Sequence, residues 1–131
     1  MSMTHIYPVL IKESYLDSFG HMNNAAYLEL MEEASWDMLT KCGLDLKTIK
    51  ASGIGPTILA INIRFMKELL LREEVIIETR VLMSEKKIFN VQHRMMRGEE
   101  ICCEAEFVMA LFDLSQRKIV TPTLAWLQAI G

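Results

Sequence analysis

The sequence predicts an α+β fold in which a curved antiparallel β-sheet wraps around one long central α-helix. Apolar side chains recur at helical spacing over residues 24–42, and residues 57–113 carry almost continuous β-strand signal. The helical segment is apolar over too much of its surface to be buried by one flat contact. A sheet that curves around the helix satisfies all three observations.

The first half of the chain supplies one strand and the helix. Residues 4–14 are predicted to form a strand, and the helix of residues 24–42 should end at Gly43, since glycine is favoured just past a helix end. Its polar side carries Glu29, Glu33, Asp37 and Lys41. The following segment, KTIKASGIGP at residues 47–56, contains two glycines and a proline and is predicted to be a loop.

The second half is predicted to be a series of antiparallel hairpins. Turns are expected at residues 84–85, Gly98 and residues 114–116, and Thr121-Pro122 is expected to begin a short final helix. Between these turns the strands are predicted at residues 57–67, 73–83, 86–97, 99–113 and 118–120. Alternation is clearest in the fourth strand, where one face carries Ile101, Cys103, Ala105, Phe107, Met109 and Leu111. Cys102 and Cys103 should then point to opposite faces, one packed and one partly exposed.

Size, charge and cysteine content restrict the class of protein. A chain of 131 residues buries one core, so residues 1–131 are predicted to be a single domain. The net charge of −3 favours neither nucleic acid nor an anionic membrane as a partner. Three cysteines, two of them adjacent, favour a reducing compartment over a disulfide framework. With no basic leader and no apolar run near the ~20 residues that cross a bilayer, we expect a cytoplasmic protein.

The turn before the helix is a candidate reaction site. The first N–H groups of a helix lack internal partners, so residues 23–26 offer donors to a polarised carbonyl. Asp17 precedes them on the turn and places a carboxylate on the other side of such a carbonyl. So sparse a site suits a thioester, because a thiolate leaves without needing strong protonation. Asp17 would either attack the carbonyl or act as a base on water, and the residues leave both roles open.

The same residues carry a family resemblance. The stretch DSFGHMNNAAYL, residues 17–28, resembles the D-x-x-G-H-x-N-N-x-x-Y-L signature of hot-dog-fold acyl-CoA thioesterases related to 4-hydroxybenzoyl-CoA thioesterase. The resemblance covers the order of elements over nearly the whole chain. One segment departs from it: where many members have a proline and then a glycine, FMKELLLREE has Glu68 and Arg72.

The resemblance implies a hot-dog fold, acyl-CoA hydrolysis without metal or cofactor, and active sites at the interface of a homodimer or homotetramer. Asp17 would be the catalytic carboxylate and the N–H of Asn24 would polarise the thioester carbonyl. His21 would take part in catalysis or order the turn. The remaining substrate-binding positions implied by the signature are Gly20, which gives the turn, Asn23 beside it, and Tyr27 below the site.

Several alternatives remain open from the sequence. His21 is either a general base or a residue hydrogen-bonded within the loop to hold Asp17. Glu32 or Glu33 on the helix would be the next carboxylate to consider if Asp17 is only a turn residue. Acyl carrier protein thioesters are a related substrate class. A hot-dog enoyl-CoA hydratase or dehydratase, and a non-catalytic acyl-CoA-binding or assembly protein, are the rival functions. The three histidines have no metal-ligand spacing, so no metal site is predicted.

Overall fold

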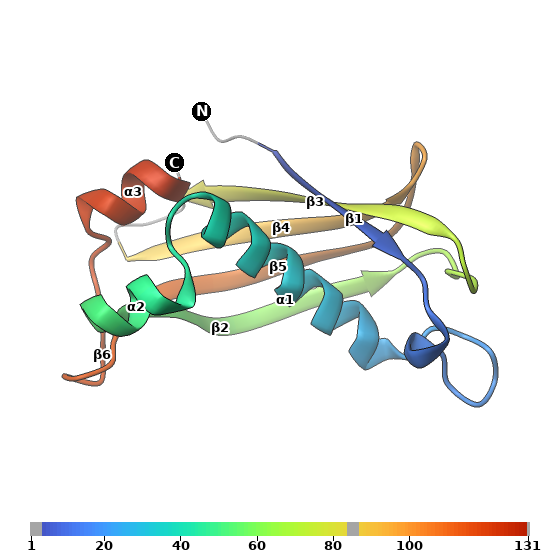
Figure 1. Ribbon diagram of the computed structural model, residues 1–131, viewed down its shortest axis with the longest axis horizontal. Helices are drawn as coiled ribbons and strands as arrows, with labels where there is room; N and C mark the ends of the chain where they lie inside the picture. Colours follow the sequence, from blue (N-terminus) through green and yellow to red (C-terminus); the bar gives the residue numbers. More distant parts are fainter. Residues whose placement is uncertain (1–3, 84–86, 131) are drawn as a thin grey trace.

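A computed structural model describes residues 4–83 and 87–130 and contains one antiparallel sheet crossed by a long helix (Figure 1). The strands follow the order β1-β3-β4-β5-β2, and β6 pairs with β5. The sheet curves over α1, as the sequence predicts. The strand bounds are β1 His5–Leu10, β2 Ile54–Phe65, β3 Glu74–Met83, β4 Ile88–Arg97, β5 Glu100–Asp113 and β6 Lys118–Val120.

The central helix α1, Asn24–Lys41, lies within one residue of its predicted bounds. Its apolar side packs on the inner face of the sheet, and its acidic side faces outward. The predicted contrast between the two sides is therefore confirmed. The buried side chains of α1 are Ala26, Tyr27, Leu30, Met31, Ala34 and Leu39.

Strand β5 confirms the predicted alternation except at Cys102 and Ala110, which are buried as well. Cys103, Ala105, Phe107, Met109 and Leu111 are all buried. Cys102 and Cys103 are both fully buried, so the expectation of one partly exposed thiol was wrong. The reason is a register shift between Met95 and Met96, which leaves Cys102 as an extra residue in the β4–β5 pairing and breaks the alternation. Burial raises the pKa of the Cys103 thiol to about 12 and removes its reactivity.

The predicted loop at residues 47–56 is largely a helix, which corrects the sequence reading. Helix α2, Leu46–Ser52, begins after Asp45, whose carboxylate accepts a hydrogen bond from the N–H of Thr48 at 2.9 Å. It ends at Gly53, which has the left-handed φ of 74° that favours glycine. Both caps are visible in the sequence, but the two glycines and the proline of this segment favoured a loop instead.

The two ends of the described chain also differ in detail from the prediction. The first strand stops at Leu10, and residues Glu13–Tyr15 form a short 3-10 helix, η1. The final helix, α3 Leu124–Ile130, begins two residues after Pro122, and the hydroxyl of Thr123 accepts the N–H of Trp126 at 3.4 Å.

The turn predicted at residues 84–85 lies outside the described residues. Of the helices within the described residues, none has the length and apolarity needed to span a membrane.

A buried histidine joins α1 to the sheet. His93 on β4 has no exposed surface, and its ring contacts the hydroxyls of Thr79 (Nδ1 to Oγ1, 2.9 Å) and Ser35 (Nε2 to Oγ, 3.1 Å). The edge of its ring also meets Phe107, with the ring centres 4.7 Å apart. Burial lowers the pKa of His93 to about 4, so the ring is neutral in the folded protein at neutral pH.

We expect His93 to make the protein less stable as the pH falls from 6.5 toward 4. Over this range His93 binds a proton in the unfolded chain but stays neutral in the folded chain. This difference lowers the free energy of unfolding by roughly 3 kcal/mol at pH 4. His93→Gln removes the titrating group, so its free energy of unfolding should depend less on pH over this window. Urea unfolding followed by the fluorescence of Trp36 and Trp126 measures both slopes. Equal slopes in the two proteins would contradict this role.

Candidate active site

The segment before α1 folds into a tight closed loop. Leu16 and Met22 form an isolated β-bridge, and the N–H of Asp17 donates to the carbonyl of His21 at 2.8 Å. The N–H of Gly20 donates to the carbonyl of Asp17 at 3.1 Å, and Gly20 adopts a φ of 80°. A left-handed residue is needed to close so short a loop, which explains the glycine of the signature.

The carboxylate of Asp17 is held by the backbone of its own loop. Its Oδ1 accepts hydrogen bonds from the N–H groups of Phe19 at 2.9 Å and His21 at 3.2 Å. Among the described residues, no side chain or backbone donor contacts the second oxygen, Oδ2. The side chain is exposed. Asp17 thus presents one oriented and one free carboxylate oxygen at the surface of the loop.

The N-terminus of α1 presents an open backbone donor directly after this loop. Asn23 is the N-cap: its Oδ1 accepts the N–H of Ala25 at 2.7 Å, and its carbonyl accepts the N–H of Ala26 at 2.9 Å. The N–H of Asn23 itself donates to the backbone carbonyl of Tyr15 at 2.7 Å. Within residues 4–83 and 87–130, the N–H of Asn24 has no such acceptor. It carries the positive end of the helix dipole and is available to a ligand oxygen.

A small pocket of about 240 Å³ opens at this helix end. Tyr27 forms part of its wall, buried and edge-on to Phe65 with the ring centres 5.0 Å apart. Burial raises the pKa of Tyr27, so its hydroxyl stays protonated at neutral pH. The pocket therefore combines apolar side chains with a few polar groups. It is lined by His21, Met22, Asn24, Tyr27, Phe65, Met66, Lys67 and Glu68.

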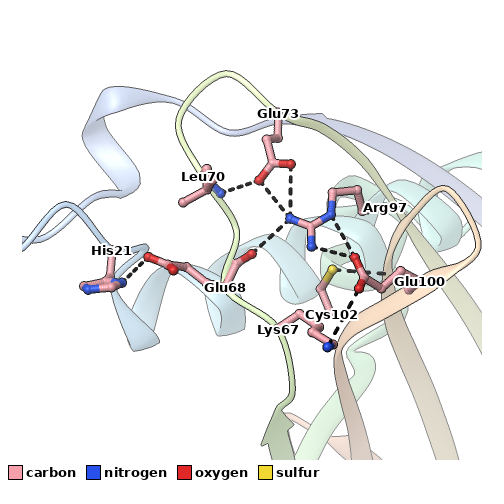
Figure 2. Close-up of polar contacts among 8 residues, drawn as sticks. All are labelled: His21, Lys67, Glu68, Leu70, Glu73, Arg97, Glu100 and Cys102. Carbon is pink, nitrogen blue, oxygen red and sulfur yellow. Dashed lines mark hydrogen bonds and ion pairs between the residues drawn. The ribbon is translucent and has the colours of Figure 1, made fainter.

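His21 contacts Glu68 through its side chain and Asp17 through its backbone. Its ring Nδ1 contacts Oε1 of Glu68, which lies on the segment between β2 and β3 (Figure 2). Its backbone N–H and carbonyl are two of the groups that hold Asp17, beside the N–H groups of Phe19 and Gly20. His21 thus belongs to the hydrogen-bonded turn, and both of its predicted roles, in catalysis and in ordering the turn, stay predictions. Glu68 itself was noted only as a departure from the family pattern and was not predicted as a site residue.

The alternative carboxylates lie on a different surface. Glu32 and Glu33 line a separate hollow on the outer side of α1 together with Trp36, and the carboxylate of Glu33 accepts the hydroxyl of Tyr7 at 3.2 Å. Neither lines the pocket at the helix N-terminus. The structure thus brings His21, Asn24 and Tyr27 together at the pocket and places Glu32 and Glu33 on another surface. The other predicted site residues, Asp17, Gly20 and Asn23, belong to the adjoining loop and do not line the pocket. Among the described residues, no group of His, Cys, Asp or Glu side chains is arranged to hold a metal ion.

Two comparisons with known proteins match most of the chain. The thioesterase-like superfamily profile matches residues 11–129. The long-chain acyl-CoA thioesterase FadM of Escherichia coli (strain K12) is 30% identical over 112 residues, which cover 84% of each chain.

Solved structures confirm the predicted hot-dog fold. The 1,4-dihydroxy-2-naphthoyl-CoA thioesterase Slr0204 from Synechocystis has a TM-score of 0.89 at 17% identity, over 98% of this chain and 96% of that one. The protein SAV2348 from Staphylococcus aureus, solved in complex with CoA, has a TM-score of 0.90 at 14% identity, over 99% of this chain and 83% of that one.

Proposed function

We propose that this chain, which belongs to the thioesterase-like superfamily and is a thioester hydrolase, acts on acyl-CoA with Asp17 and the N–H of Asn24 as its reacting groups. The observation that carries the proposal is the closed loop that holds Asp17 and leads directly into an open helix N-terminus. The relative FadM is named for long-chain acyl-CoA, and the pocket wall of Met22, Tyr27, Phe65 and Met66 suits an apolar acyl group.

The proposed reaction uses the two groups from opposite sides of the carbonyl. The N–H of Asn24 donates to the thioester oxygen and stabilises the negative charge that develops there. Asp17 either removes a proton from attacking water or attacks the carbonyl carbon itself to form a mixed anhydride. In both routes a carbon–oxygen bond forms, the carbon–sulfur bond breaks, and the thiolate leaves with the electron pair. Water supplies the second oxygen of the free acid, directly or when it opens the anhydride.

Release of free thiol from a panel of short, medium, long and aromatic acyl-CoA substrates tests this function. Acyl-CoA hydrolysis predicts thiol release from at least one member, and the same acyl groups on acyl carrier protein test the second carrier. Hydration of an enoyl-CoA without thiol release would favour the hydratase or dehydratase. Binding of acyl-CoA by calorimetry without any turnover would favour the non-catalytic acyl-CoA-binding protein.

We also propose that the protein is a homodimer, or a homotetramer built from such dimers, that pairs through β2. The sheet has two outer strands, β1 and β2. Strand β1 has six residues and includes Pro8, which cannot donate to a further strand. Strand β2 has twelve residues, and its apolar side chains Ile58, Leu59 and Ile61 are more than one-third exposed. The longer and more apolar edge is the better surface for a second copy.

Leu59→Lys is expected to shift the protein toward monomer. A lysine on β2 places a charge in the proposed contact, whereas Ile6→Lys on β1 places the same charge on the opposite edge. The two positions are matched in exposure, at 45% for Leu59 and 42% for Ile6. Light scattering after size exclusion should report at least twice the 15.1 kDa chain mass for wild type and Ile6→Lys. A dimer that survives Leu59→Lys but not Ile6→Lys would place the interface at β1.

A further inference from the structure

Residues 66–73, here called the crossover segment, connect the two halves of the sheet next to the candidate active site. Because β2 lies at one edge and β3 lies beyond β4, this segment crosses the ends of β4 and β5 (Figure 1). Its N–H groups at Met66 and Lys67 both donate to the carbonyl of Cys102 at 2.9 Å, and Leu69 is fully buried. The crossover segment is therefore anchored at its start and its middle.

One arginine holds the rest of the crossover segment. Arg97, at the end of β4, donates from Nη1 to the carbonyl of Glu68 at 3.0 Å and to both carboxylate oxygens of Glu73 at 3.0 and 3.1 Å (Figure 2). Its Nε and Nη2 donate to Oε1 of Glu100 at 3.1 and 2.6 Å. Glu73 in turn accepts the N–H of Leu70 at 2.6 Å. One guanidinium nitrogen, Nη1, thus binds both ends of residues 68–73, while Nε and Nη2 bind Glu100 and fix the orientation of the group.

The crossover segment contacts the loop of Asp17, residues 16–22, through Glu68. The carbonyl of Glu68 accepts a hydrogen bond from Arg97, while its carboxylate contacts the ring of His21 (Figure 2). The backbone of His21 supplies one donor to the carboxylate of Asp17 and one acceptor to its N–H. A continuous series of contacts therefore joins Arg97 to Glu68, Glu68 to His21 and His21 to Asp17.

We propose that Arg97 and Glu68 are positioning residues that hold the loop of Asp17 in its working orientation. This inference rests on the proposed function, since it assigns these residues to the same site. Neither side chain is a reacting group in the proposal: Glu68 restrains His21, and Arg97 fixes the backbone from which Glu68 projects. Their removal should lower kcat, because a displaced catalytic group reacts slowly even when the substrate still binds.

A double-mutant cycle on kcat tests the proposal. Glu68→Ala and Arg97→Ala are each expected to lower kcat by about tenfold with KM changed by less than about threefold. Because both act through one contact, the double variant should be no slower than the slower single variant. Arg94→Ala is the matched control: Arg94 lies on the same strand and faces Glu104 at 3.8 Å, away from the pocket, and its loss should leave kcat unchanged.

Thermal unfolding of the four proteins in the cycle separates positioning from stability. Loss of Arg97 should lower Tm by a similar amount with or without the Glu68 side chain, whereas its effect on kcat should vanish in Glu68→Ala. If Arg97→Ala does not fold, Arg97→Gln takes its place in the cycle, since glutamine keeps a polar side chain but is too short to replace the contact between Nη1 and the carbonyl of Glu68. Independent effects on kcat that multiply in the double variant, or wild-type kcat in Glu68→Ala, would overturn the proposal.

The same assay distinguishes this inference from the proposed function. Absence of thiol release from every acyl-CoA by the wild-type protein would refute both. Activity that is lost in Asp17→Asn but unchanged in Glu68→Ala would refute the positioning role alone.

Discussion

Asp17→Asn is expected to lower kcat for acyl-CoA hydrolysis by roughly a hundredfold to ten-thousandfold, the range associated with loss of a positioned acid or base. The asparagine Oδ1 can still accept the N–H groups of Phe19 and His21, so the loop should keep its closed form. What is lost is the negative charge and the free carboxylate oxygen. The effect should therefore appear in turnover, with little change in folding.

Asp45→Asn provides a matched control for this substitution. Asp45 also lies before a helix and accepts a backbone N–H, that of Thr48, but it caps α2, whereas Asp17 lies in the loop that precedes α1. Its amide variant should hydrolyse acyl-CoA like the wild type. Thiol release gives kcat and KM, and tryptophan fluorescence in urea checks folding. Equal turnover by Asp17→Asn and the wild type would show that the catalytic carboxylate lies elsewhere, and Glu32→Gln would be the next variant to measure.

The elements that the sequence predicted well are those whose pattern is long and local. Eighteen residues of helical periodicity located α1, and the alternation of Cys103, Ala105 and Phe107 located the buried face of β5. Helix α2 was missed because seven residues are too few for a periodic pattern, so its existence depends on the caps at Asp45 and Gly53. The burial of Cys102 was missed because a bulge depends on how two strands pair, which one strand's sequence does not contain.

The same distinction applies to the site. Asp17, His21 and Asn24 are close in sequence, so a turn followed by a helix was enough to predict that Asp17 and His21 share a loop that leads into the first residue of α1. Their roles in catalysis stay predictions. The contact between Glu68 and His21 requires the whole sheet, because β2 must run its full length before the crossover segment reaches the loop. Its only sequence signal was a carboxylate in a segment that departs from the family pattern. The positioning role of Arg97 had no sequence signal, since its three acceptors converge only in the folded chain.

The backbone donor at Asn24 can be removed without removing the helix. Asn24 is the first residue of α1, a position where proline is well tolerated. The residue before a proline must be extended, and Asn23 already has φ −61° and ψ 137°. Asn24→Pro therefore deletes the one N–H that the proposed mechanism needs and should leave the helix in place.

We expect Asn24→Pro to lower kcat by about a hundredfold to a thousandfold, the effect of losing one donor from an oxyanion hole. Asn24→Ala keeps the N–H and loses only the side chain, so it should retain wild-type turnover. Comparing the two separates the backbone donor from the amide, and a KM close to that of the wild type would show that the proline ring does not block the pocket. Full activity in Asn24→Pro, or an equal loss in both variants, would exclude the N–H of Asn24 as the group that stabilises the developing oxyanion.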